Sequence, residues 1–98
     1  MFTPERPMNL HIEHRPEHGR FLAVVDGHEC VADYRIANGV MALTHTGVAP
    51  QLQGRGIAAA LVQAALDHAQ TQGLKVDPIC SYARVYMRRH PATLSLLA

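Results

Sequence analysis

The fold is decided by residues 46–58, which read TGVAPQLQGRGIA. Two closely spaced glycines, Gly54 and Gly56, precede a change in the apolar pattern. From residue 57 onward the apolar side chains recur three and four positions apart, which predicts an amphipathic helix; they are Ile57, Ala58, Leu61, Val62, Ala65, Leu66 and Ala69. Gly73 is the expected C-terminal stop of this helix. Residues 46–58 therefore connect a preceding element to a helix.

The sequence before this stretch has the alternating or near-continuous apolar runs that indicate β-strands. Strands are expected over residues 9–14, 21–25, 30–36 and 40–48. The dipeptides Asp26-Gly27 and Asn38-Gly39 favour two-residue hairpins, because both positions of each tolerate positive φ. The simplest arrangement is a four-stranded antiparallel meander.

The sequence after the helix predicts a short strand over residues 74–79 and a second helix over residues 81–90. A strand that returns through a helix lies parallel to the strand it left, in a right-handed crossover. Ser81 is the expected N-cap of the last helix. The predicted fold class is α+β, with a mixed, mostly antiparallel sheet of about five strands, a β-α-β crossover and a short C-terminal helix.

Composition narrows the class of protein. The chain has 98 residues, 48% of them apolar and 17% charged, which is typical of one domain over residues 1–98. Residues 1–8 are expected to be flexible. A formal net charge of +1 argues against a nucleic-acid partner. No apolar run is long enough for a membrane span or a signal peptide, so we expect no membrane partner and a cytoplasmic location, as a monomer or homodimer.

Metal binding and disulfides are not expected. Cys30 and Cys80 are too few for a disulfide framework or a structural zinc site, so we expect reduced thiols, with Cys30 in the core. His11, His14 and His18 fall in a strand and a turn, where His11 and His14 point to opposite faces. No metal site is therefore predicted.

The glycine turn before the helix can attract phosphate. The first N–H groups of a helix have no partner inside it, and the helix dipole and Arg55 add positive charge. The pattern lacks the Lys and Ser/Thr of a Walker loop and the third glycine of a dinucleotide-binding turn. A turn that binds nothing is the alternative interpretation.

The spacing Gln51-x-x-Gly54-x-Gly56 between a strand and a helix resembles the acetyl-coenzyme A signature of the GCN5-related N-acetyltransferases. A small, single-domain subfamily is resembled more closely, over about residues 9–97. The residues that carry this second resemblance are His45-Thr46-x-Val48, Gly54-Arg55-Gly56-Ile57-Ala58, Gly73-Leu74-Lys75-Val76, Cys80 and Tyr86-x-Arg88-Arg89-His90-Pro91.

The resemblance implies a sheet that opens between the fourth and fifth strands, with the pantetheine arm of coenzyme A in the gap and the pyrophosphate on the turn. The implied coenzyme ligands are Thr46, Val48, Gln53, Gly54, Arg55, Gly56, Ile57, Ala58 and Arg89. The implied activity is acetyl transfer from acetyl-coenzyme A to a primary amine of a small molecule or protein. A coenzyme A-binding sensor without turnover is the alternative.

The resemblance also implies the catalytic residues. Cys80 is its nucleophile, at a strand-helix junction where the helix N-terminus lowers a thiol pKa; a lone cysteine is otherwise a small buried apolar residue. His45 is the candidate general base, or an ordinary strand histidine. Tyr86 would protonate the departing thiolate, or serve as a packing residue. Direct attack by the amine is the alternative to an acetyl-Cys80 intermediate.

Overall fold

The protein has one five-stranded sheet with strands in the order β1-β2-β3-β4-β5. The computed structural model describes residues 10–98, so residues 1–8, expected to be flexible, lie outside the described part. The elements in chain order are β1 (Glu13–Arg15), η1 (Pro16–His18), β2 (Arg20–Val25), β3 (His28–Ala37), β4 (Val40–Gly47), η2 (Pro50–Leu52), α1 (Ile57–Thr71), β5 (Lys75–Pro78), α2 (Ser81–Arg89) and η3 (Pro91–Leu96).

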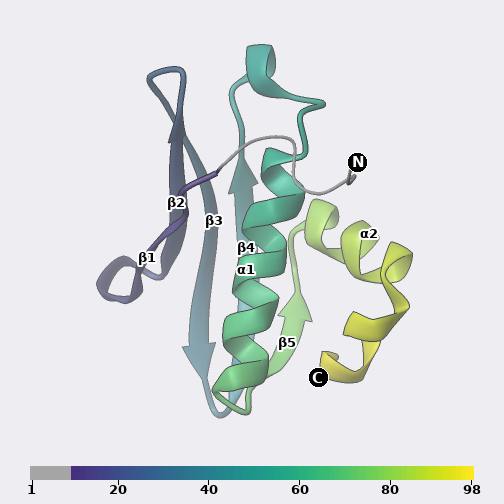
Figure 1. Ribbon diagram of the computed structural model, residues 1–98. Helices are drawn as coiled ribbons and strands as arrows, with labels where there is room; N and C mark the ends of the chain where they lie inside the picture. Colours follow the sequence, from purple (N-terminus) through teal and green to yellow (C-terminus); the bar gives the residue numbers. More distant parts are fainter. Residues whose placement is uncertain (1–9) are drawn as a thin grey trace, which may run out of the picture.

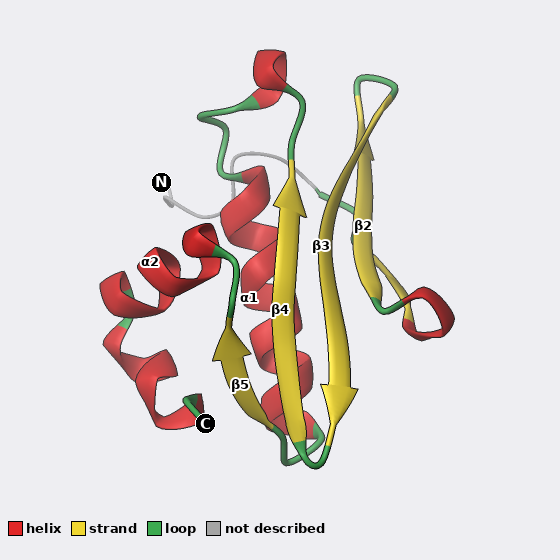
Figure 2. Cartoon of the chain, turned by 180° about the vertical axis from the view of Figure 1, so that it is seen from behind, coloured by secondary structure: helices red, strands yellow, loops and turns green. Residues whose placement is uncertain are grey.

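The helix α1 lies across one face of the sheet, while α2 and η3 lie beside β5 (Figure 1). Seen from behind, no described helix crosses the other face of the sheet (Figure 2). The apolar stripe of α1 is buried against the sheet as predicted, at Ile57, Leu61, Val62, Ala65, Leu66 and Ala69. Among residues 10–98, no helix is both long and apolar enough to cross a membrane.

The hairpin predictions are confirmed. Strands β2 and β3 are joined by Asp26-Gly27 with φ of 52° and 79°, and β3 and β4 by Asn38-Gly39 with φ of 54° and 78°. Positive φ at both central positions gives a turn whose twist matches that of the flanking strands.

The crossover is also confirmed, because β5 pairs parallel to β4 through α1. Gly73 ends the helix as expected: its φ is +71°, and Leu74 N–H donates to the carbonyl of Ala69 at 2.8 Å. The fold class is the mixed, mostly antiparallel α+β sheet that the sequence predicts.

Several element boundaries differ from the sequence prediction, among them those of β1, β5 and α2. Strand β1 covers only Glu13–Arg15, since Leu10 and Ile12 leave the sheet edge and pack against the core. Ile79 lies beyond β5 and is 49% exposed. The N-cap of α2 is Cys80 rather than Ser81.

Strand β1 is held by a ring cluster. The imidazole of His14 stacks on Phe21 at a centroid distance of 4.1 Å and meets His68 of α1 edge-on at 4.4 Å. The Tyr34 hydroxyl and His14 Nε2 are hydrogen-bonded. Burial lowers the pKa of His14, the neighbouring His68 lowers it further, and Glu17 opposes both. The folded state therefore favours a neutral His14.

This cluster makes stability depend on pH. The pKa of His14 is lower in the folded than in the unfolded state. The contribution of neutral His14 to the free energy of unfolding is therefore complete above the unfolded pKa of 6.5 and is lost as the pH falls through the folded pKa. We expect the unfolding temperature to fall less between pH 8 and pH 5 in His14→Phe than in the unsubstituted protein. Thermal unfolding at both pH values tests this, with exposed His11→Phe as control. An equal fall in all three proteins would contradict it.

Candidate active site

The site begins where the hydrogen bonds between β4 and β5 end. The last paired residues are Leu43 and Pro78, and proline has no N–H to continue the ladder. One more backbone bond follows, from Cys80 N–H to the carbonyl of Leu43 at 2.9 Å. Beyond it β4 continues to Gly47 paired with β3, while the chain after β5 turns away into α2 (Figure 2). The predicted opening between the fourth and fifth strands is therefore present.

A β-bulge at Thr44 decides which side chains of β4 face this opening. Tyr34 of β3 lies opposite Leu43, but the next residue back, Asp33, lies opposite His45, so Thr44 is an extra residue. The bulge reverses the alternation of faces along β4. Thr46 consequently pairs with buried Ala32 on the side of the sheet that α1 covers.

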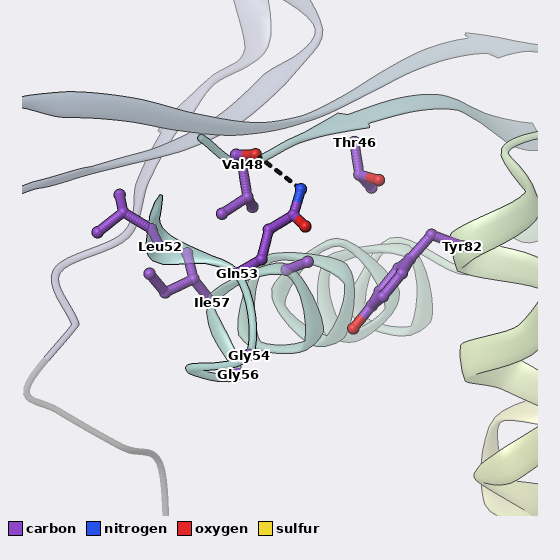
Figure 3. A pocket seen from close by; sticks show the side chains of 9 residues that line it. Thr46, Val48, Leu52, Gln53, Gly54, Gly56, Ile57 and Tyr82 are labelled. Carbon is purple, nitrogen blue, oxygen red and sulfur yellow. Dashed lines mark hydrogen bonds between the residues drawn. The ribbon is translucent and has the colours of Figure 1, made fainter. Parts of the chain in front are cut away.

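A cleft of about 500 Å³ lies between the end of β4, the first turn of α1 and the start of α2. Figure 3 shows the side chains that line it. Seven of the lining residues are predicted coenzyme ligands: Thr46, Val48, Gln53, Gly54, Gly56, Ile57 and Ala58. Two others, Leu52 and Tyr82, were not predicted. Most residues of the cleft lining are thus ones that the family resemblance implies as coenzyme ligands.

The first turn of α1 supplies free hydrogen-bond donors to the cleft. Its N-cap, Gly56, has φ of +81° and offers no side-chain cap, and the first intrahelical bond runs from Ala60 N–H to Gly56 at 3.0 Å. The N–H groups before Ala60 have no helical partner. Gly54, with φ of +84°, also needs the left-handed conformation that favours glycine. An anionic group fits this end of the cleft.

Two polar side chains of the turn, those of Gln51 and Arg55, contact the β2–β3 hairpin and lie outside the cleft lining. Gln51 hydrogen-bonds to His28 at 2.9 Å, and Arg55 forms an ion pair with Asp26 of the β2–β3 hairpin at 3.2 Å. Arg55, predicted as a coenzyme ligand, is therefore not brought to the cleft lining. Its charge is partly balanced by Asp26.

The thiol of Cys80 lies next to the cleft. Its Sγ is 3.6 Å from the hydroxyl oxygen of Thr46, which lines the cleft. Burial is the largest single influence on the pKa of Cys80, and it raises the pKa. Hydrogen bonds with the backbone of Ala83, the Thr46 hydroxyl and the backbones of Tyr82 and Thr46 each lower the pKa, and together they outweigh burial. The pKa of the thiol is thus below its ordinary value, as expected of a reactive cysteine.

His45 is not brought to the thiol, which corrects the prediction of a Cys80–His45 pair. It lies opposite Asp33, on the face of the sheet away from Thr46. Its Nε2 would be 3.1 Å from a Cβ at Gly47, so the imidazole lies across that glycine. The bulge at Thr44 is the reason, because it gives Thr46 the position that simple alternation assigns to His45.

The tyrosine assignment also needs correction. Tyr86 is 8% exposed, stacks on His90 at 3.9 Å, and donates its hydroxyl hydrogen bond to Gln63 of α1. Its hydroxyl is thus committed to helix packing. Tyr82, one helical turn earlier, lines the cleft instead. Because Tyr82 and Tyr86 are four residues apart, they lie on the same side of the helix, so the spacing marks both as candidates without choosing between them.

Arg89 lies exposed in the last turn of α2. It is outside the cleft lining, although its positive charge lowers the pKa of Tyr82 against the larger, raising effect of burial. Cys30 is fully buried in the core, as predicted, and both cysteines are free thiols. Among residues 10–98, no three His, Cys, Asp or Glu side chains lie together as metal ligands would.

The cleft lies at the end of two diverging parallel strands, with free helix amides at one end and the thiol of Cys80 near the other. Two comparisons identify the family. The family model of the GCN5-related N-acetyltransferases matches residues 20–96. The chain therefore belongs to this family and is an N-acetyltransferase, which favours the enzyme over the non-catalytic sensor.

A solved structure is similar over nearly the whole chain. The NMR solution structure of a GCN5-like protein from Staphylococcus aureus, which carries a provisional N-acetyltransferase assignment, superposes with a TM-score of 0.73. The two sequences are 26% identical, and the match covers 92% of this chain and 89% of the other. The fold is thus shared over most of both chains.

The environment of Cys80 predicts its reactivity. We expect iodoacetamide to alkylate Cys80 in the folded protein, with an apparent pKa below the ordinary thiol value, while buried Cys30 stays unmodified. Thr46→Val should raise that apparent pKa, because it removes a hydroxyl that favours the thiolate. Mass spectrometry of alkylation against pH measures both. An unchanged profile in Thr46→Val would show that the hydroxyl does not act on the thiol.

Proposed function

We propose that this N-acetyltransferase binds acetyl-coenzyme A in the cleft and transfers the acetyl group to a primary amine through Cys80. The observation that supports this most directly is the composition of the cleft, which joins the uncapped N-terminus of α1 to Thr46, the residue that contacts the Cys80 thiol. Members of this family generally use acetyl-coenzyme A as co-substrate, so a phosphate end and a thioester end are both required.

The first turn of α1 would hold the pyrophosphate. Its free N–H groups donate hydrogen bonds, and the positive end of the helix dipole favours the anion. Gly54 and Gly56 leave the backbone open for close approach. The pantetheine arm would then run along Val48 toward Thr46, where the unpaired edge of β4 offers backbone groups.

The acyl transfer would take place in two steps at Cys80. In the first, the Cys80 thiolate attacks the acetyl carbonyl carbon, a bond to Sγ forms, and the bond to the sulfur of coenzyme A breaks. In the second, the amine nitrogen attacks the acetyl-Cys80 carbonyl, the new C–N bond forms, and Cys80 leaves as thiolate. The amine releases its proton to solvent. The lowered pKa of Cys80 supports both roles, because it favours the thiolate as nucleophile and as leaving group.

A charge at the turn tests the binding site. Ala58→Glu places a carboxylate in the cleft lining, where it should repel the pyrophosphate and weaken acetyl-coenzyme A binding by at least about tenfold. Ala60→Glu is the matched control, since it adds the same charge near the same helix end but outside the cleft lining. Calorimetric titration measures both affinities. Equal affinities in the two variants would contradict the site.

A second experiment tests the covalent route. Mixing the protein with acetyl-coenzyme A should give an acetyl adduct on Cys80 by peptide mass spectrometry, and Cys80→Ala should abolish it. Cys30→Ala should keep the adduct, because Cys30 is buried away from solvent. Turnover of Cys80→Ala at the unsubstituted rate would instead support direct attack by the amine, with acetyl-coenzyme A binding unaffected.

A further inference from the structure

The three tyrosines of the chain differ in what their hydroxyl groups contact. The Tyr34 hydroxyl is hydrogen-bonded to His14, and the Tyr86 hydroxyl donates to Gln63. Tyr82 differs from both, because its hydroxyl has no hydrogen bond within residues 10–98. It is therefore the tyrosine whose hydroxyl is free to bind a ligand.

Tyr82 is also the residue through which α2 lines the cleft, since the other lining residues belong to the segment from β4 to α1. Its side chain is 39% exposed. In Figure 3 the ring extends from α2 toward α1, with the hydroxyl at its far end, pointing away from Thr46. The hydroxyl thus lies toward the phosphate end of the cleft rather than the thioester end.

We propose that Tyr82 is a specificity residue that donates its hydroxyl hydrogen bond to the pyrophosphate of the co-substrate, opposite the free N–H groups of α1. This inference rests on the proposed function, because it takes the phosphate end of the cleft to be the first turn of α1. The ring then closes the α2 side of the cleft over the ligand. Tyr82 would therefore distinguish thioesters that carry a pyrophosphate from those that do not.

The protonation state of the Tyr82 phenol allows it to donate a hydrogen bond. Burial raises the pKa of Tyr82, and this effect exceeds the opposing one of the nearby Arg89 charge, so the phenol keeps its proton at neutral pH. A hydrogen bond to a charged acceptor is stronger than one between neutral groups. The position of the hydroxyl argues against protonation of the departing sulfur, which would lie near Thr46 and Cys80.

Binding measurements with three forms of the ligand test this role. Tyr82→Phe keeps the ring and removes the hydroxyl, so the dissociation constant for acetyl-coenzyme A should rise about 10- to 100-fold. The same rise is expected with the 3′-dephospho form, which keeps the pyrophosphate. Affinity for S-acetylpantetheine, which lacks it, should not change. Tyr34→Phe is the matched control, because it removes a hydroxyl from the ring cluster rather than from the cleft.

The outcomes separate this inference from the proposed function. If the unsubstituted protein does not bind acetyl-coenzyme A, the proposed function fails. If the unsubstituted protein binds acetyl-coenzyme A and Tyr82→Phe binds each of the three ligands with the same affinity as the unsubstituted protein, only the role of Tyr82 is overturned. A Tyr82→Phe protein with normal affinity but slower formation of acetyl-Cys80 would make Tyr82 a proton donor instead, and would likewise overturn the pyrophosphate contact. Thermal unfolding of both variants verifies that each is folded.

Discussion

The end of the β4–β5 ladder is the constraint on which the site depends. Pro78 cannot donate a ladder hydrogen bond, and the N–H of Cys80 makes the last one, to Leu43. That bond fixes Cys80 beside the strand just where the strands part. It also sets the start of α2, because Cys80 is the N-cap of this helix. The cleft, the position of the thiol and the direction of α2 therefore share one cause.

The bulge at Thr44 is a second constraint, and it acts on side chains rather than on the backbone path. One extra residue in β4 brings Thr46 to the side of the sheet where α1 and Cys80 lie. It moves His45 to the opposite face, which no described helix covers. Hydrogen bonds with a hydroxyl and with backbone groups lower the pKa of the Cys80 thiol without a contribution from His45.

In the binding mode that we propose, backbone groups of the cleft take the place of ligand-binding side chains, of which a small chain has few. The free amides of α1 supply donors without any side-chain entropy to lose. Two polar side chains of the turn contact the β2–β3 hairpin, Gln51 through His28 and Arg55 through Asp26, and lie outside the cleft lining. Tyr82 adds a polar side chain on the α2 side of the cleft.

The sequence by itself determined the features that depend on neighbours along the chain. The Asp-Gly and Asn-Gly pairs set the hairpins through local backbone geometry, and the apolar spacing set α1 by placing those residues on one helix face. The glycine turn followed from a local pattern, and seven of the nine residues that line the cleft followed from a family resemblance. Only the tertiary structure decided which of His45 and Thr46 faces Cys80 and which of Tyr82 and Tyr86 faces the cleft. Those choices depend on an inserted residue that shifts strand register and on how α2 packs against α1, and neither is encoded in the spacing of the residues concerned.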